Sequence, residues 1–218
     1  MELENCVCPV QMKTHSNADM KIPASRRRNG FTLVELLVVI AIIAVLAAAG
    51  FAAGNAAIQK ARKVTCLNQA TGIETSVNSF FTDYGYMPKE GSTDTTVKTD
   101  KEVTLLTVLL GLEGNSGNIL NSRGVKYLVA KEGKKVGTKG SGGLIYNSTG
   151  SAVTGLYDPW GGGYSVMMDL DFDEKLIPVT AAGGKSITLN GRRVAVWSDG
   201  ADGVNGGGKS SDDVTTWK

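Results

Sequence analysis

A run of 24 residues, 31–54, constrains this chain most strongly, because it is largely apolar and contains a single charged residue, Glu35. As an α-helix the run would be about 36 Å long, at roughly 1.5 Å per residue. The hydrocarbon core of a bilayer is about 30 Å thick. The run therefore predicts a transmembrane helix that spans the bilayer with some tilt.

The residues before this run, 1–30, are polar, lack periodicity and end in three arginines, residues 26–28. This pattern predicts a cytoplasmic leader that is not part of the fold. Because basic flanks stay on the cytoplasmic side, the chain after residue 54 is expected outside the inner membrane. A second basic group, at residues 60–63, weakens that bias.

A cleaved secretory signal peptide is the alternative interpretation, with the small residues 47–49 as its cleavage site. Glu35 argues against it. A carboxylate inside an apolar helix costs about 2.5–3.5 kcal/mol on insertion scales, and such a residue usually faces a partner. In a signal peptide that is cleaved off and degraded, no partner would offset that cost.

Composition excludes several classes of function. The net charge of +2 gives no case for nucleic acid binding. The three cysteines, Cys6, Cys8 and Cys66, cannot all pair with one another, so a disulfide framework is not expected. Cys6 and Cys8 are predicted to be an unstructured thiol pair, and Cys66 a buried small hydrophobe. With His15 as the one histidine, His-based triads are excluded, and an enzyme is the poorest interpretation.

Beyond residue 54 the apolar residues recur at helical spacing, which predicts that the helix continues as an amphipathic half, residues 55–88. Tyr84–Pro88 should end it. The residues expected on its apolar face are Ala57, Ile58, Ala61, Val64, Cys66, Leu67, Ala70, Ile73, Val77, Phe80 and Phe81.

Residues 89–143 form a variable segment in this interpretation. It comprises a polar linker, a short helix, another short element and a mobile basic loop, at residues 89–102, 102–112, 118–130 and 132–143.

Residues 144–218 are predicted to be a β-sheet head. Its strands are expected at residues 144–146, 164–172, 186–189 and 193–197. Asn190-Gly191 predicts a hairpin between the last two. The alternating acids of Asp169–Asp173 suit a strand with one wet face. An EF-hand loop is rejected there because Glu174 replaces the turn glycine and Thr180 the bidentate glutamate.

The C-terminal segment carries two patterns. Gly203–Ser210 fits the P-loop signature G-x-x-x-x-G-K-S. A phosphate loop needs a helix after its lysine, and eight residues rich in acidic and β-branched types follow, so the match is interpreted as accidental. The surrounding carboxylates suit a hard cation such as Ca²⁺, with a solvated acidic tail as the alternative. These carboxylates belong to Asp199, Asp202, Asp212 and Asp213.

The segment Gly30-Phe31-Thr-Leu-Val-Glu35 resembles the prepilin cleavage and methylation motif shared by type IV pilins and type II secretion pseudopilins. The resemblance implies an α+β pilin-like fold, with a long N-terminal helix packed on a small antiparallel head. It implies cleavage by prepilin peptidase between Gly30 and Phe31 and methylation of the new Phe31 amine. Glu35 would pair with that amine on a neighbouring subunit. Many members have a proline where this chain has Ala52, flanked by glycines that soften the helix by about 1 kcal/mol each.

Asp158-Pro159-Trp160-Gly161, followed by Tyr164, resembles a motif of the major pseudopilin of type II secretion. Asp158 and Pro159 would form an Asx-type turn, and Trp160 would anchor it. The segments 198–203 and 212–217 resemble that family's calcium loop. The resemblance implies Asp202 and Asp212 as side-chain ligands, with Asp213 as the alternative to Asp212. Carbonyls near Asp199 and Val214 would be backbone ligands.

Together these patterns predict a membrane-anchored pseudopilin without catalytic activity. It would polymerise with itself into a periplasmic filament, alongside minor pseudopilins and an inner-membrane assembly platform. A type IV pilin for adhesion, motility or DNA uptake is one alternative, and a secreted calcium-binding protein without a filament is another.

Overall fold

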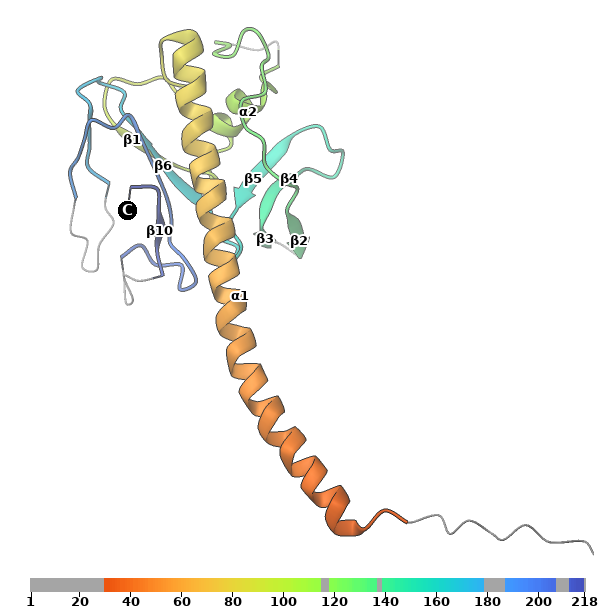
Figure 1. Ribbon diagram of the computed structural model, residues 1–218. Helices are drawn as coiled ribbons and strands as arrows, with labels where there is room; N and C mark the ends of the chain where they lie inside the picture. The colour runs from red at the N-terminus through yellow and green to blue at the C-terminus, as the bar shows by residue number, and fades with distance from the viewer. Residues whose placement is uncertain (1–29, 115–117, 137–138, 179–186, 207–211, 218) are drawn as a thin grey trace, which may run out of the picture. The chain divides into compact units, whose positions relative to one another are not determined.

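The computed structural model describes residues 30–114, 118–136, 139–178, 187–206 and 212–217. It divides the chain into two compact units, Met1–Ala48 and Ala49–Lys218, and helix α1 (Leu33–Tyr84) contributes residues to both (Figure 1). Some predictions fall outside the described residues: residues 1–29 of the leader with their cysteines and His15, the last four residues of the P-loop pattern, Thr180, and the first residue of the strand expected at 186–189.

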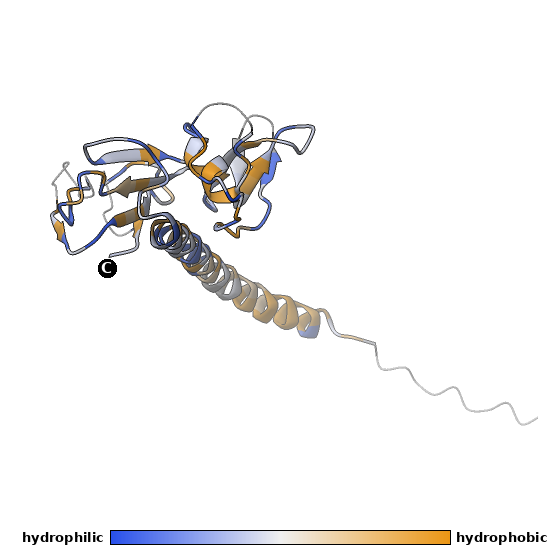
Figure 2. Cartoon of the chain, turned by 90° about the horizontal axis from the view of Figure 1, so that it is seen from above, coloured by the Kyte–Doolittle hydropathy of each residue, from blue (hydrophilic) through white to orange (hydrophobic). Residues whose placement is uncertain are grey.

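In the first unit, the described residues form the beginning of α1. Its side chains are apolar except for Glu35 (orange in Figure 2). The large hydrophobic side chains between Leu33 and Leu46 are all exposed, by 44–79%. Counted over the described residues alone, no helix meets the length and apolarity needed to cross a membrane. The span at residues 31–54 therefore stays a prediction.

In the second unit, α1 packs through a narrow seam. The completely buried seam residues follow one another at steps of four and three, as one face of a helix requires; they are Cys66, Ala70, Ile73, Val77 and Phe80. The predicted face is wrong before Cys66, because Ala57, Ile58, Ala61 and Val64 are exposed, as is Leu67. Periodicity identifies a face, but it does not say how far along the helix that face is covered. The helix ends at Tyr84, where Gly85 adopts φ 77°.

The head is built on a four-stranded antiparallel sheet in the order β1-β6-β9-β10. Its strands are β1 (Thr95–Lys98), β6 (Tyr164–Met168), β9 (Val194–Ser198) and β10 (Val214–Thr215). Val166 and Val196 share one core with the α1 seam and with the leucines of α2 (Thr104–Leu110). On the other face, Trp197 packs with Met167 and Leu176 in a second cluster. The α+β fold is therefore confirmed, with a sheet that is covered on both faces.

Among the described residues of the head there are also three two-stranded antiparallel sheets. They pair β2 (Lys134–Val136) with β3 (Lys139–Ser141), β4 (Gly143–Tyr146) with β5 (Val153–Tyr157), and β7 (Lys175–Leu176) with β8 (Leu189–Asn190). The helix expected at residues 102–112 is confirmed as α2. Residues 118–130 contain no helix or strand in the described part of the chain.

Several strand predictions need correction. The supposed linker 89–102 contains β1, whose β-branched run buries Val97, and the supposed loop 132–143 contains the β2–β3 hairpin. The strand expected over 164–172 ends at Met168, because a turn with positive φ at Phe172 and Glu174 follows.

The hairpin predicted at Asn190-Gly191 is also wrong. Gly191 has φ 70°, as a turn requires, but β8 pairs with β7, while β9 pairs with β6 and β10. Turn chemistry fixes where the chain reverses, whereas the choice of partner strand depends on packing across the whole sheet.

Candidate functional site

Thr32 and Glu35 cap the N-terminus of helix α1. The Thr32 backbone N–H and hydroxyl both donate to Glu35 Oε2 at 2.8 Å, and the Glu35 N–H lies 3.2 Å from the Thr32 hydroxyl oxygen. This is a capping box, in which a threonine and a glutamate three residues later satisfy each other's backbone donors. The sequence signal for it is the Thr-x-x-Glu pattern of Thr32 and Glu35, which lies within the prepilin motif itself.

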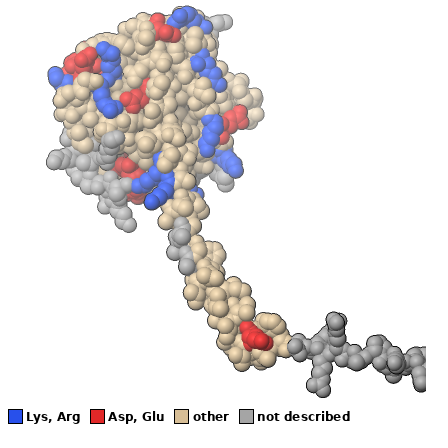
Figure 3. All heavy atoms as spheres, viewed as in Figure 1, with Lys and Arg blue, Asp and Glu red and all other residues tan. Residues whose placement is uncertain are grey.

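The residues just before this cap are exposed to solvent. Gly30 and Phe31, the residues on either side of the predicted cleavage site, are both exposed. Figure 3 shows one acidic patch on an otherwise uncharged helical segment, and Glu35 is the one charged residue between Leu33 and Ala48. In the isolated chain the carboxylate is therefore held by its own helix start.

Asp158 organises the turn after β5. It is 1% exposed, and its Oδ1 accepts from the N–H groups of Trp160, Gly161 and Gly162 at 2.8, 2.7 and 2.9 Å. The first of these bonds makes an Asx turn. Burial raises the pKa of the Asp158 carboxyl, and the hydrogen bonds act against this shift. The half-buried Trp160 donates its indole N–H to Gln59 of α1 at 3.2 Å.

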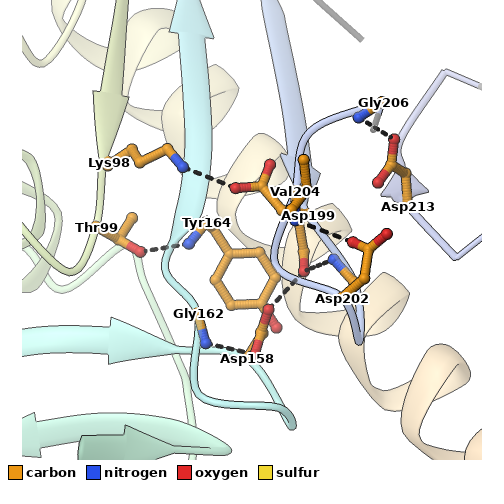
Figure 4. A network of polar contacts seen from close by, with 12 residues as sticks. Lys98, Thr99, Asp158, Gly162, Tyr164, Asp199, Asp202, Val204, Gly206 and Asp213 are labelled. Carbon is orange, nitrogen blue, oxygen red and sulfur yellow. Dashed lines mark hydrogen bonds and ion pairs between the residues drawn. The ribbon is translucent and has the colours of Figure 1, made fainter. Parts of the chain in front are cut away.

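The same carboxylate connects the turn to the end of β9. The Ser198 hydroxyl donates to Asp158 Oδ2 at 2.6 Å and accepts from the Gly200 N–H at 3.1 Å. Close by, Lys98 from β1 forms an ion pair with Asp199 Oδ2 at 2.7 Å (Figure 4). The sequence pointed to Asp158 and placed Ser198 in the calcium-loop segment 198–203, but it indicated neither the Ser198–Asp158 bond nor the role of Lys98, because these contacts join residues far apart in the chain.

The C-terminal loop is closed by strand pairing. Val214 of β10 lies opposite Ser198 of β9, so continuing the antiparallel register by one residue places Asp213 beside Asp199. Gly200 has φ 70°, and a Cβ there would collide with the Asp212 carbonyl. Glycine is therefore required for the two arms of the loop to approach. The described residues after the P-loop pattern, 212–217, contain β10 and no helix.

Three of the four predicted carboxylates meet in this loop. One oxygen from each of Asp202, Asp212 and Asp213 lies within 4.8 Å of the others. Backbone N–H groups donate to each of the three carboxylates: Val204 to Asp202 Oδ1 (2.9 Å), Asp202 to Asp212 Oδ2 (3.2 Å) and Gly206 to Asp213 Oδ2 (3.0 Å). Asp199 is not in this group and is paired with Lys98 instead.

The electrostatics of the loop fit a hard cation. Asp212 Oδ1 is buried and has no hydrogen-bond partner among the described residues. Burial raises the pKa of the Asp213 carboxyl, and the charges of Asp199, Asp212 and Asp202 raise it further. An all-oxygen, carboxylate-rich donor set is what Ca²⁺ prefers. The residues present therefore fit the ion that the sequence resemblance implied.

Cys66 lies in the core of the head. Cys66 is buried against the sheet, and burial raises the pKa of its thiol to about 11, which keeps it protonated at neutral pH. This agrees with the interpretation of Cys66 as a small hydrophobe.

Residues 25–51 match a family described as the prokaryotic N-terminal methylation motif. The chain is also 30% identical over 117 residues to the fimbrial protein EcpC of Eikenella corrodens, an alignment that covers 52% of this chain and 75% of that protein. No solved structure gives a significant match. These matches agree with the long N-terminal helix and the antiparallel head. The chain therefore belongs to the type IV pilin-like family, whose members are structural subunits, processed by prepilin peptidase, that polymerise into filaments.

Proposed function

We propose that this chain is a subunit of a type II secretion pseudopilus. In this proposal the chain is cleaved after Gly30, methylated on Phe31, anchored in the inner membrane by residues 31–54, and polymerised into a periplasmic filament that drives protein export. The observation that carries the proposal is the convergence of Asp202, Asp212 and Asp213 in the C-terminal loop, since this is the loop that resembles the calcium loop of the major pseudopilin.

Calcium would supply positive charge that offsets the repulsion among these three carboxylates. Asp202, Asp212 and Asp213 would hold it, and carbonyls near Asp199 and Val214 are proposed as further ligands. The Asp158–Ser198 bond and the Lys98–Asp199 ion pair fix the first arm of the loop, and the pairing of β10 with β9 fixes the second. The loop ends are thus positioned by the sheet itself.

Asp202→Ala is expected to lower the melting temperature in calcium but not in chelator. An ion at 100 times its dissociation constant stabilises the fold by about 2.7 kcal/mol, which corresponds to roughly 5–10 °C in a head of this size. Circular dichroism monitors the thermal unfolding of the full chain in detergent, once in a buffer with calcium and once in a buffer with a calcium chelator. Glu132→Ala, which removes an exposed acid from another part of the head, is the matched control. A melting temperature of Asp202→Ala equal to that of the wild type in both buffers would discard the loop as a calcium site.

A surface pilus is the second candidate function, and the similarity to a fimbrial protein favours it. Deleting the gene separates the two functions. A pseudopilin mutant should retain exoproteins that the parent strain releases, while surface filaments and twitching persist. Loss of twitching with normal exoprotein release would instead support the pilus, and complementation in trans would show that either defect belongs to this chain.

A further inference from the structure

A second group of carboxylates lies at the opposite end of the sheet from the C-terminal loop. Strands β1 and β6 lie side by side (Figure 1). In their ladder Thr95 lies opposite Met168, so the next pair in the antiparallel register is Asp94 and Asp169. Like charges placed directly opposite each other destabilise a pair of strands. The pairing of β6 with β9 puts Ser198, and with it the C-terminal loop, at the other end of β6, beside Tyr164. The two acidic groups are therefore separate.

Asp171 joins this pair. One oxygen from each of Asp94, Asp169 and Asp171 lies within 4.8 Å of the others. Asp94 Oδ1 accepts from the Leu170 N–H at 3.1 Å, and Asp171 Oδ1 accepts from the Asp173 N–H at 3.2 Å. The three carboxylates range from buried through half-buried to exposed, for Asp169, Asp94 and Asp171 respectively, so the group extends from the interior to the solvent.

The buried member is the informative one. Asp169 is 0% exposed, and its Oδ2 accepts from the Glu174 N–H at 3.0 Å. Its Oδ1 is buried and has no hydrogen-bond partner among the described residues. A buried carboxylate oxygen without a partner costs free energy that a bound cation would remove.

Nearby charges are divided into two sets. Within the same turn, Asp173 pairs with Lys175 at 3.4 Å and Glu174 pairs with Arg193 at 3.1 Å. In the described part of the chain, Asp94, Asp169 and Asp171 form no ion pair with a lysine or arginine. Lys175 and Arg193 thus neutralise the two acids that follow in the same turn, and the charges of Asp94, Asp169 and Asp171 are not balanced by an ion pair among the described residues.

We propose that Asp94, Asp169 and Asp171 bind a second divalent cation of the calcium class. The donors are all oxygen, and the exposed side of Asp171 leaves room for the water ligands that complete six to eight positions around Ca²⁺. The site is not an EF-hand, because Asp94 comes from a different segment of the chain, 75 residues before Asp169 in the numbering. The bound ion would tie the edge strand β1 to the end of β6 and would fix the turn that follows.

The test is calcium binding by the metal-free full chain in detergent, measured by equilibrium dialysis with radioactive calcium up to about 1 mM, the weak end of the range for extracellular modules. Asp169→Asn should bind one ion fewer per chain than the wild type. Asp171→Asn, which changes an exposed side chain and leaves the buried one in place, should lose the same ion and carries the test if Asp169→Asn fails to fold. Asp173→Asn, in the same turn but paired with Lys175, should bind as the wild type does.

Asp212→Asn distinguishes this site from the C-terminal loop. If both sites exist, Asp212→Asn and Asp169→Asn each lose one ion, and the double variant loses both. If Asp212→Asn has no effect while Asp169→Asn removes binding, the C-terminal loop fails as a calcium site and the second site stands. Unchanged calcium binding in Asp171→Asn and in folded Asp169→Asn would overturn the second site, as would a wild-type chain that binds no calcium.

Discussion

Asp158→Ala is expected to lower the melting temperature of the head by about 10 °C or more. The substitution leaves three backbone N–H groups, those of Trp160, Gly161 and Gly162, without their acceptor, and it removes the acceptor of the Ser198 hydroxyl. A buried donor without a partner, here the Ser198 hydroxyl, costs about 1–3 kcal/mol, and the N–H groups of half-buried Trp160 and Gly161 and exposed Gly162 are expected to lose about 1 kcal/mol each. About 2–4 °C is lost per kcal/mol in a domain of 150–250 residues. Thermal unfolding of the full chain in detergent, followed by circular dichroism, measures the effect.

Asp158→Asn is the matched control, because an amide keeps one acceptor oxygen for the three N–H groups. It should melt between the wild type and Asp158→Ala. A melting temperature of Asp158→Ala within about 2 °C of the wild type would mean that the turn after β5 is solvated and does not hold the loop.

Glu35→Ala and Glu35→Gln are both expected to be inserted and cleaved but to assemble poorly into filaments. If Glu35 pairs with the Phe31 amine of a neighbouring subunit in apolar surroundings, removing the carboxylate leaves a buried charge without its partner, at a cost of about 3–5 kcal/mol. At about 1.4 kcal/mol per factor of ten, this weakens subunit association by more than roughly a hundredfold. Filaments sheared from cells and quantified by immunoblot give the assembly yield, and mass spectrometry of the mature N-terminus gives processing.

Because Glu35 also closes the capping box, Glu35→Gln and Thr32→Ala together separate its role in the helix start from its role in pairing with Phe31. Glutamine can replace glutamate at this position of a capping box, so Glu35→Gln keeps the bond with Thr32 and loses only the charge. Thr32→Ala does the reverse, since it weakens the cap and keeps the charge. Normal assembly of Glu35→Gln with poor assembly of Thr32→Ala would show that Glu35 serves the helix start alone, and the pairing with Phe31 would have to be abandoned.

Features that depend on local chemistry could be predicted from the sequence. The apolar run with Glu35, the helix end near Tyr84 and the short helix α2 follow from spacing and turn residues within a few positions of one another. The antiparallel arrangement of the head was implied by the family resemblance. For the C-terminal loop, the resemblance to a calcium loop named the three carboxylates that the structure brings together, Asp202, Asp212 and Asp213.

What the tertiary structure alone decided is which distant segments become neighbours. The register of β1 on β6 places Asp94 opposite Asp169, β8 pairs with β7 and not with β9, and Ser198 reaches Asp158 from 40 residues away. Asp199, expected at the calcium loop, pairs with Lys98 because β1 forms the edge of the sheet near it. Strand partners and their register are chosen by the burial of a whole sheet face, a free energy summed over residues that are far apart in the chain, and a local pattern does not contain that sum.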